Sequence, residues 1–518
     1  MRFRRGVRAS VVVSSLMLSA AAPAAAAPSP QQAPDALRAD LDRILSDPRL
    51  NPDQTGLVVR DPTSHQVLYS RNGDRPRTPA SNVKLLTSAA AMDVLGPDHR
   101  FRTDVLASGQ RRGATLQGDL HLRGTGDPTT LPGDYDRLAA DVAARGIKQV
   151  RGRLLTDDAF FDGQRHPEGW DRDDFSSYYG AATSALTAAP DADYDPGSVI
   201  VQVAPGSSGQ APDVRLTPQT GAVHVVNRAT TGAANSASSL QVQRDPGSDQ
   251  IVVSGSVPAG SQPAKEYVSV PDPTAYAGDL FARALAAHGV AIGPVAAAPT
   301  PPGARPLAAH ESMPLREMLV PFLKLSNNGH AEALTKAMGR QERGQGSWAA
   351  GTAVIEQRLR SFGVDPSAIK LTDGSGLSKL DEVPPEQFGR LLDAARGRPW
   401  FRTWYEALPI AGEKDRVVGG TLRNRMAGTP AQGTVHAKTG SMTGVTSISG
   451  YATTADHRPL VFSSLFNGFR SEAPQDLEDA IAVRLAEDGG SGGSSPGVKT
   501  FHAPAPQVDE KRAHKPRD

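Results

Sequence analysis

Apolar and polar residues recur along the chain with two periodicities, the alternation typical of strands and the spacing of three to four residues typical of helices. These periodicities divide the chain into strand-rich and helix-rich stretches. Near the N-terminus, "TGLVVRDPTSHQVLYSRN" alternates on both sides of "DPTSH", which predicts a β-hairpin with its turn at the centre. The apolar run that follows, 81–95, predicts a helix that ends at Gly96. The folded chain is therefore expected to begin with a strand hairpin and a helix.

The middle of the chain, 97 to about 308, is rich in Gly, Pro and Asp and holds short β-like runs. The runs from "GSVIVQVAPG" to "DQIVVSGSV" predict a small β-rich unit with frequent turns, and "TAYAGDLFARALAAHGV" predicts an amphipathic helix after it. A proline-rich connection, 297–306, ends this region.

The C-terminal part is helical first and strand-like last. Four helical patterns, beginning with "LREMLVPFLKL", precede the β-like runs "GTVHAKTG", "TSISGYATT" and "RPLVFSSLFNG". The first hairpin and these three strands can form one antiparallel sheet with helices on both faces. The chain has 518 residues, too many for one core. We therefore expect a multidomain α/β (α+β) protein whose outer segments form one discontinuous domain around an insertion.

The two ends of the chain differ from the rest in composition. Four arginines within the first eight residues precede "VVVSSLMLSAAA" and a run of small residues, which predicts a secretory signal peptide, 1–26, cleaved after Ala26. Its apolar core is too short for a membrane anchor, and no internal run could span a bilayer. The tail, 488–518, lacks apolar periodicity and is predicted to be disordered. We therefore expect an exported protein of the cell wall or periplasm, or a secreted one.

Overall composition removes several classes of function. The apolar content of 38% and charged content of 21% are ordinary for a folded protein, and a net charge of +1 argues against a nucleic-acid binder. The chain has no cysteine, which removes thiol catalysis and cysteine metal sites. Its 12 histidines show no HExxH spacing, so we expect no metal and no cofactor.

Ser81 and Lys84 lie three residues apart at the start of the predicted apolar helix. That spacing puts both on one helical face, and a serine at a helix start is close to N–H groups that can bind an oxyanion. A lysine becomes a base when burial or a second cation lowers its pKa. The alternative is a capping serine with a surface lysine. Ser367 and Lys370 repeat the spacing, so the pair alone is weak evidence.

Ser326 and Asn328 lie in a short link between two predicted helices. As functional residues, the serine would relay a proton and the amide would orient a substrate. The alternative is an ordinary interhelical loop, since Asn-Asn-Gly favours a turn. Ser70 and Asn72 have the same spacing, so this pair is also weak in isolation.

"HAKTGSM", residues 436–442, ends a β-like run. A lysine beside a strand edge can hold a substrate carboxylate, and Gly440 lets a substrate backbone approach closely. The alternative is a strand end with a solvated lysine.

The order of the three motifs decides between these alternatives. Ser-x-x-Lys, Ser-x-Asn and Lys-Thr-Gly in this order resemble penicillin-binding proteins and serine β-lactamases. Ser367 fails because no Ser-x-Asn lies between it and Lys438. The distance from Ser81 to Ser326 (326 − 81 = 245 residues) is far longer than in a compact β-lactamase. The chain resembles the low-molecular-mass class C penicillin-binding proteins, the D-alanyl-D-alanine carboxypeptidase/endopeptidases of peptidase family S13.

This resemblance covers roughly 35–485 and includes "GTGDPTTL", "GWDRDDFSSYYGAATSALT" and "DGSGLS". It implies a transpeptidase-like domain of the penicillin-binding protein and β-lactamase type with two inserted domains, one nested in the other. The implied limits are 35–96 and 307–487 for the transpeptidase-like domain, 97–187 and 266–306 for inserted domain II, and 188–265 for the nested β-rich domain III.

Matching the motifs residue by residue implies a set of roles. Ser81 is the acylated nucleophile, Lys84 its base, and Ser326 relays the proton to the leaving amine. Asn328 bonds the amide of the penultimate residue, Lys438 and Thr439 hold the terminal carboxylate, and the N–H groups of Ser81 and Ser441 form the oxyanion hole. In members selective for a free diaminopimelyl end, the side-chain pocket matches Trp170, Asp173, Tyr178 and Met442 here. Trp170 and Tyr178 could equally be domain core.

The resemblance implies a serine D,D-carboxypeptidase/endopeptidase that acts on D-Ala-D-Ala and D-Ala-diaminopimelate bonds of peptidoglycan stem peptides and is inhibited covalently by β-lactams. One alternative is a serine β-lactamase, but no Glu-x-x-Leu-Asn stretch supplies its deacylation base. Another is a catalytically inert wall-binding homologue, against which the three intact motifs argue. The balance of the two peptidase activities and the oligomeric state are left open.

Overall fold

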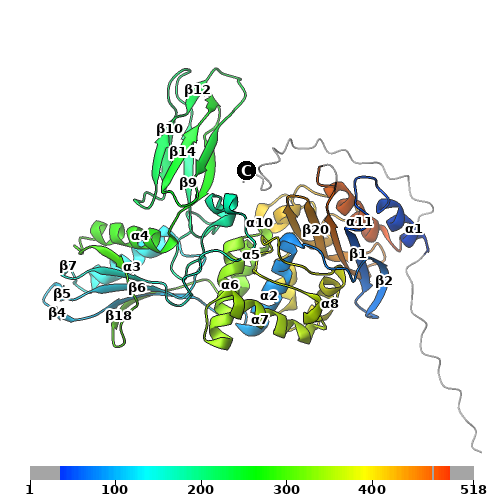
Figure 1. Ribbon diagram of the computed structural model, residues 1–518, viewed down its shortest axis with the longest axis horizontal. Helices are drawn as coiled ribbons and strands as arrows, with labels where there is room; N and C mark the ends of the chain where they lie inside the picture. Colours follow the sequence, from blue (N-terminus) through cyan, green and yellow to red (C-terminus); the bar gives the residue numbers. More distant parts are fainter. Residues whose placement is uncertain (1–34, 470–471, 491–518) are drawn as a thin grey trace, which may run out of the picture.

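The computed structural model describes residues 35–469 and 472–490 (Figure 1). The predicted signal peptide, 1–26, and residues 491–518 of the predicted tail lie outside this part. Within the described residues, no helix combines the length and the apolar character needed to cross a membrane.

One five-stranded antiparallel sheet joins the two ends of the chain. Its order is β19 (Val435–Met442), β20 (Val445–Thr453), β21 (Pro459–Asn467), β1 (Thr55–Asp61) and β2 (Gln66–Arg71). The predicted sheet of the first hairpin and the last three strands is therefore confirmed. β19 is an edge strand: the segment 409–411 pairs with its outer side at Val435–Ala437, and beyond this pairing the edge can take another extended chain.

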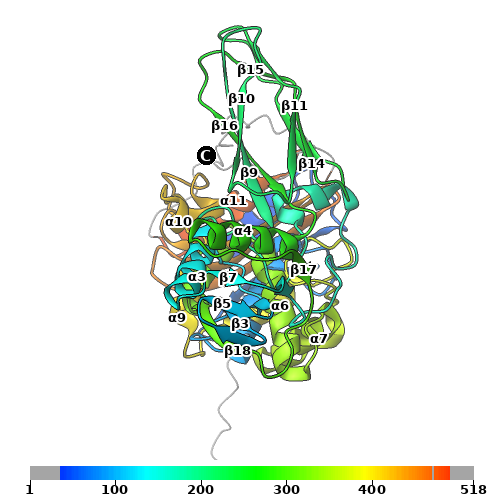
Figure 2. The ribbon, with the colours of Figure 1, turned by 90° about the vertical axis from the view of Figure 1, so that its left-hand side faces the viewer.

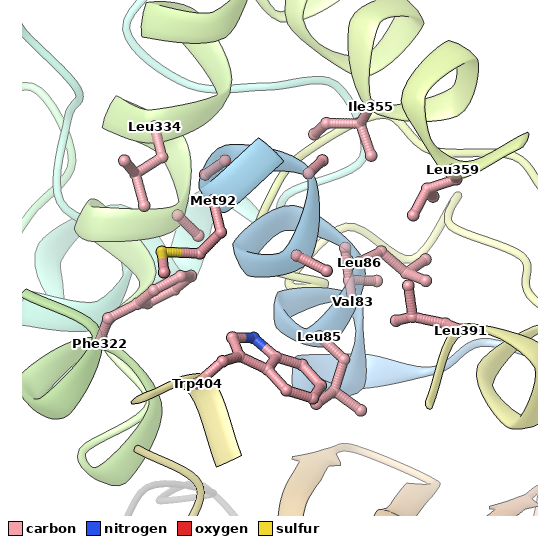
Figure 3. Close-up of a cluster of buried hydrophobic side chains, with 14 of the residues drawn as sticks. Val83, Leu85, Leu86, Met92, Phe322, Leu334, Ile355, Leu359, Leu391 and Trp404 are labelled. Carbon is pink, nitrogen blue, oxygen red and sulfur yellow. The ribbon is translucent and has the colours of Figure 1, made fainter. Parts of the chain in front are cut away.

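Helices cover both faces of this sheet. One face carries α2 (Val83–Val94), α5 (Leu315–Lys324), α6 (Asn328–Arg343), α7 (Trp348–Leu359), α8 (Pro385–Ala395) and the short α9 (Phe401–Glu406). Apolar side chains surround α2 on all sides, which makes it the central helix of this layer (Figure 3). The other face carries α1 (Asp35–Ile44) and α11 (Gln475–Glu487), which pack together. The sequence pattern had predicted neither of these two helices.

The inserted region has its own core around a second five-stranded sheet. The strand order is β17 (Val295–Ala297), β8 (Leu154–Asp157), β6 (Leu120–Gly124), β3 (Arg102–Ala107) and β18 (Arg305–Glu311). Helices α3 (Pro132–Ala144) and α4 (Pro273–Ala287) pack on it, and the short strands β4 (Gln110–Arg112), β5 (Thr115–Gln117) and β7 (Gln149–Val150) form a small sheet beside it.

A β-rich finger projects from the inserted region, as Figures 1 and 2 show. Its strands are β9 (Ser198–Ala204), β10 (Asp213–Thr217), β11 (His224–Asn227), β12 (Thr230–Gly232), β13 (Gln241–Arg244), β14 (Gln250–Ser254), β15 (Ser256–Pro258) and β16 (Ala264–Ser269). These strands form three small sheets, β10-β9-β16, β11-β14-β13 and β12-β15. The turn-rich pattern of the sequence corresponds to this finger.

The domain limits stay predictions, but two strands cross them. β18 pairs with β3 as far as Glu311, beyond the predicted limit at 306, and β16 pairs with β9 as far as Ser269, beyond the predicted limit at 265. Pairing strands belong to one domain, so we propose these limits after Glu311 and Ser269.

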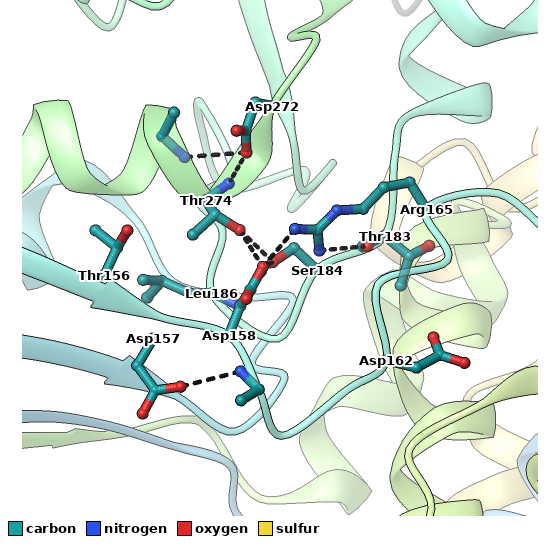
Figure 4. A network of polar contacts seen from close by, with 12 residues as sticks. Thr156, Asp157, Asp158, Asp162, Arg165, Thr183, Ser184, Leu186, Asp272 and Thr274 are labelled. Carbon is teal, nitrogen blue, oxygen red and sulfur yellow. Dashed lines mark hydrogen bonds and ion pairs between the residues drawn. The ribbon is translucent and has the colours of Figure 1, made fainter. Parts of the chain in front are cut away.

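A polar network holds the long loop after β8 against α4 (Figure 4). The Oδ2 of Asp158 accepts hydrogen bonds from the Thr274 hydroxyl at 2.6 Å, from Arg165 at 2.5 Å and from the Ser184 hydroxyl at 3.2 Å. Asp272 caps α4 by accepting from the backbone N–H of Thr274 at 2.9 Å. The loop is thus anchored to a helix at the point where it turns toward the first sheet.

Candidate active site

Ser81 lies in a single 3₁₀ turn, Ala80–Asn82, directly before α2. The helix therefore begins at Val83, two residues later than predicted. The turn is held against the sheet, since the Ser447 hydroxyl donates to the carbonyl of Pro79 at 2.8 Å and Asn82 donates to Ser449 at 2.9 Å. The preceding residue, Ala80, has a φ of 48°, a strained conformation that the surrounding contacts must maintain.

Lys84 is fully buried one turn after Ser81. Its Nζ lies 2.8 Å from the Oγ of Ser81, 2.7 Å from the Oδ1 of Asn328 and 2.9 Å from the carbonyl oxygen of Ser375. Burial lowers the pKa of Lys84 to about 7, although the charges of Asp373 and Glu332 act in the opposite direction. A large fraction of Lys84 is therefore neutral near neutral pH, as a base requires.

Asn328 is the first residue of α6 and connects two parts of the site. Its Oδ1 faces Lys84, and its Nδ2 donates to the carbonyl of Tyr179 at 2.8 Å. Tyr179 belongs to a short turn, Tyr178–Gly180, of the inserted region. The inserted region thus reaches the second motif directly.

Ser326 and Lys438 form the second serine–lysine contact of the site. The Nζ of Lys438 donates to the Ser326 hydroxyl at 2.9 Å and to the carbonyl of Thr439 at 2.6 Å. Ser326 has a φ of 61°, which turns its side chain out of the helical path between α5 and α6. Lys438 is fully buried, and burial together with the nearby charge of Lys84 lowers its pKa well below the usual value.

The end of β19 runs close beside the nucleophile. A Cβ at Gly440 would lie 2.4 Å from the Ser447 hydroxyl and 2.9 Å from the backbone nitrogen of Ser81, so a side chain cannot fit there. The Thr439 hydroxyl donates to that of Thr421 at 2.7 Å, and Ser441 accepts from Gln475 at 3.4 Å. This glycine brings the strand edge next to Ser81.

The four predicted pocket residues differ in how they are placed. Trp170 is buried and donates its indole N–H to Asp373 at 2.7 Å. Tyr178 is half-buried and packs edge-on against the rings of Tyr179 and Tyr267. Met442 is half-buried at the end of β19.

Asp173 is exposed in the short turn Arg172–Ser176, between two acids that have partners. Asp171 pairs with Lys379, and Asp174 accepts from the Tyr179 hydroxyl at 3.0 Å. Among the residues that the structure describes, no hydrogen bond or ion pair involves the carboxylate of Asp173. It is the acid of this stretch that a ligand could use.

The two other pairs with these spacings, Ser367 with Lys370 and Ser70 with Asn72, lie elsewhere, and Ser70 belongs to strand β2. Ser367 is exposed, and its hydroxyl donates to Asp365 at 2.7 Å, while Lys370 is also exposed. Asn72 donates to backbone carbonyls of the first hairpin region. Neither pair adjoins Lys84 or Lys438 through any contact in the described part of the chain.

Sequence reasoning missed three residues at the site. Asp373 and Glu332 are buried close to Lys84, and Ser375 contributes only its backbone carbonyl. A signal for Asp373 was present in "DGSGLS", where an acid heads a run of small residues. Among the described residues, no cluster of three or more His, Asp or Glu side chains is placed to hold a metal ion.

The family profile of the D-Ala-D-Ala carboxypeptidase 3 (S13) family matches residues 37–488. The chain belongs to this family. It is a serine peptidase and thus a hydrolase, and the family predicted from the motifs is confirmed.

Two curated relatives of this S13 peptidase match over most of its length. The D-alanyl-D-alanine carboxypeptidase of Actinomadura sp. (strain R39) is 46% identical over 460 residues, which cover 88% of this chain and 85% of that protein. The D-alanyl-D-alanine carboxypeptidase DacB of Haemophilus influenzae is 27% identical over 428 residues, which cover 80% of this chain and 85% of that protein.

Solved structures show the same fold. The crystal structure of penicillin binding protein 4 from Haemophilus influenzae matches with a TM-score of 0.74 at 24% identity, over 86% of this chain and 98% of that one. The same protein in complex with a β-lactam matches with a TM-score of 0.69 at 25% identity, over the same shares. The predicted fold class is confirmed.

Proposed function

We propose that this S13 peptidase is an exported D,D-carboxypeptidase and endopeptidase that hydrolyses peptidoglycan stem peptides through an acyl-enzyme on Ser81. One observation carries the proposal: the Nζ of Lys84 lies 2.8 Å from the Ser81 hydroxyl, and burial lowers its pKa to about 7. The family and the 46% identical relative, which both carry the name D-Ala-D-Ala carboxypeptidase, support the substrate class.

Acylation begins when neutral Lys84 takes the proton of Ser81. The Oγ of Ser81 then bonds to the carbonyl carbon of the penultimate D-Ala. Negative charge develops on the carbonyl oxygen, and the backbone N–H groups of Ser81 and Ser441 stabilise it. Gly440 supports this arrangement, since its missing side chain keeps β19 beside the nitrogen of Ser81.

The C–N bond breaks as the leaving amine takes a proton from Ser326. Ser326 recovers its proton from Lys438, whose Nζ lies 2.9 Å away. Water then attacks the ester, its hydroxide part adding to the acyl carbon and its proton passing to Lys438. Ser81 leaves with the proton held by Lys84, which restores the free enzyme.

The substrate lies along the open edge of β19. Lys438 and Thr439 hold the terminal carboxylate, and Asn328 uses its second N–H for the amide of the penultimate residue, since the first is bonded to Tyr179. Trp170, Asp173, Tyr178 and Met442 form the pocket for the diaminopimelyl side chain. β-Lactams acylate Ser81 because their strained amide occupies the place of the peptide bond.

Labelling with a fluorescent penicillin tests the acyl-enzyme. The wild-type protein should hold the label stably and release D-Ala from a D-Ala-D-Ala peptide, and Ser81→Ala should lose both properties while it stays folded. Rapid release of the label would indicate a β-lactamase, and an unlabelled wild-type protein an inert homologue. Label found on Ser367 by mass spectrometry would refute the assignment of Ser81.

The proposal of export rests on the N-terminal pattern of the sequence. The mass of the protein recovered outside the cytoplasm should correspond to a chain that begins at Ala27. A full-length mass in that fraction would contradict the predicted signal peptide.

A further inference from the structure

Trp170 belongs to the inserted region, yet its indole N–H points to the loop that holds the catalytic lysine. We propose that Trp170 and Asp373 are positioning residues that fix the loop Asp373–Ser378, and with it Lys84, so that the inserted region sets the geometry of the base. The inference rests on the proposed role of Lys84. It gives Trp170 a role in every acylation, beyond that of a pocket wall for one substrate.

Asp373 gathers donors from its own loop and from the inserted region. Its Oδ1 accepts from the backbone N–H of Gly376 at 2.6 Å. Its Oδ2 accepts from the N–H of Ser378 at 2.8 Å, from the Trp170 indole at 2.7 Å and from the Ser375 hydroxyl at 3.3 Å. Both carboxyl oxygens of Asp373 therefore accept hydrogen bonds in a buried site.

The loop Asp373–Ser378 is wedged between α2 and α6. Ser375 offers its carbonyl to Lys84 at 2.9 Å, and the Thr87 hydroxyl donates to the carbonyl of Gly374 at 2.7 Å. A Cβ at Gly376, whose φ is +80°, would lie 1.9 Å from the carbonyl oxygen of Ala80. The loop therefore touches both the residue before the nucleophile and the base, and any shift of the loop is passed on to them.

Backbone carbonyls of the inserted segment 168–171 accept hydrogen bonds from the end of the same loop and from the residue after it. The Ser378 hydroxyl donates to the carbonyl of Glu168 at 2.8 Å, and the N–H of Lys379 donates to that of Gly169 at 3.3 Å. Upstream, Asp162 pairs with the buried Lys336 of α6 at 2.6 Å. Further upstream, Asp158 accepts hydrogen bonds from Arg165 and from Thr274 of α4 (Figure 4). Trp170 therefore lies where hydrogen bonds join the inserted region to the loop Asp373–Ser378.

Three charged groups face Lys84 from different elements. Asp373 comes from the loop, Glu332 from α6 and Lys438 from β19. Burial and the charge of Asp373 raise the pKa of Glu332 to about 7, and the same causes raise that of Asp381 well above its usual value. Of the two acids whose charge raises the pKa of Lys84 against burial, Asp373 has the larger effect and Glu332 the smaller one.

The test compares Trp170→Phe, Asp373→Asn and the double variant, with Trp400→Phe as a matched control. Trp400 donates its indole N–H to Asp93 at 2.8 Å, the same type of bond at the other end of α2. The rate constant for acylation by penicillin and kcat/KM for two peptides, with and without a diaminopimelyl side chain, are measured against pH.

Trp170→Phe should slow acylation by about tenfold for penicillin and both peptides alike, as expected for the loss of a hydrogen bond to a charged group. Asp373→Asn should also lower the maximal rate. Asp373→Asn removes a negative charge beside Lys84 and so lowers the pKa of that lysine. The acidic limb of the curve of acylation rate against pH should therefore move to lower pH in this variant. The double variant should be no slower than Asp373→Asn, since the two residues act as one unit. Trp400→Phe should acylate at the wild-type rate.

Three results would overturn the inference. The first is a loss of kcat/KM in Trp170→Phe that is confined to the diaminopimelyl peptide, which would make Trp170 only a wall of the side-chain pocket. The second is a pH profile of acylation in Asp373→Asn whose acidic limb stays at the wild-type pH. The third is a loss of acylation rate in Trp400→Phe equal to that in Trp170→Phe. Should Asp373→Asn fail to fold, Trp170→Phe still decides. None of these results touches the assignment of Ser81, which the Ser81→Ala labelling tests separately.

Discussion

Lys84 and Asn328 are joined by a hydrogen bond of 2.7 Å between Nζ and Oδ1, although 244 residues separate them in the chain. The first two motifs therefore form one hydrogen-bonded unit. Asn328 had been predicted only as a substrate ligand. Its contact with Lys84 indicates that it also holds the base in place, with a neutral amide where a carboxylate would favour the protonated lysine.

Asn328→Asp should shift the pH dependence of acylation. A carboxylate at this position would raise the pKa of Lys84, since an opposite charge within about 4–6 Å commonly shifts a pKa by about 1–3 units. A base must lose its proton before it acts, so the acidic limb of the acylation rate should move to higher pH by about that amount. Stopped-flow acylation by penicillin between pH 5 and 10 measures this limb.

Asn235→Asp is the control for that experiment. Asn235 is exposed in the β-rich finger, so the variant adds the same charge far from the site. Its acylation profile should match that of the wild-type protein. A limb that stays near pH 7 in Asn328→Asp would mean that Lys84 is not the group that titrates.

Much of the site could be predicted because its side chains carry recognisable chemistry in a fixed order. The position of Ser375 could not, because a backbone carbonyl leaves no mark on the sequence. Glu332 and Asp373 meet beside Lys84 only through the packing of a loop between two helices, which no local pattern encodes. The bond from Trp170 to Asp373 joins segments 203 residues apart.

The fold was predictable where apolar patterns were strong, as in the three strands that close the sheet. β18 was missed because Pro306 interrupts its pattern, and it pairs only as an edge strand, where a proline is tolerated. α1 shows its signal in retrospect, since Leu37, Leu41 and Ile44 are spaced as one helical face. The remaining helix of that layer, α11, packs on it.

Lys438→Ala should weaken substrates that bear a free terminal carboxylate. Losing a charged hydrogen bond costs about 1.5–3 kcal/mol, which corresponds to roughly ten- to a hundredfold in kcat/KM. A peptide with an amidated C-terminus should lose less, because it loses only the proton transfer through Ser326, whose hydroxyl Lys438 contacts at 2.9 Å. Kinetics on the two peptides measure the difference. Equal losses would mean that Lys438 acts through proton transfer alone and does not bind the carboxylate.

His310 should stabilise the inserted region at acidic pH. Burial alone would lower its pKa, but the hydrogen bond with Asp127 and the charge of Asp134 outweigh burial, and the pKa is raised. The stabilisation is complete below the unfolded-state pKa of about 6.5 and is lost as pH rises through the raised value.

His310→Gln should therefore lower the free energy of unfolding more at pH 5.5 than at pH 8.5. Denaturant unfolding at the two pH values measures this difference. His288→Gln serves as the control, because its contact with Asp136 at 2.9 Å is exposed and contributes little. A His310→Gln cost that does not change with pH would show that the imidazole acts by packing alone.

Asp173→Asn tests the substrate preference of the enzyme. The diaminopimelyl side chain ends in an ammonium and a carboxylate, so its pocket needs an acid. Asp171 is paired with Lys379, and Asp174 accepts from Tyr179, whereas Asp173 is exposed. One charged hydrogen bond contributes about 1.5–3 kcal/mol, so kcat/KM for a peptide with a free side-chain amine should fall roughly ten- to a hundredfold.

The N-acetylated form of the same peptide is the control substrate, because it cannot offer a cation to Asp173. Its kcat/KM should hardly change, and the ratio of the two values isolates the charge interaction. Asp245→Asn, an exposed acid of the β-rich finger, should leave both peptides unaffected. Equal losses on both peptides would make Asp173 structural. If neither peptide is affected, another acid binds the cation, and Asp174 is the next residue to test. Burial raises the pKa of Asp174, and a bound ammonium group would favour its charged form.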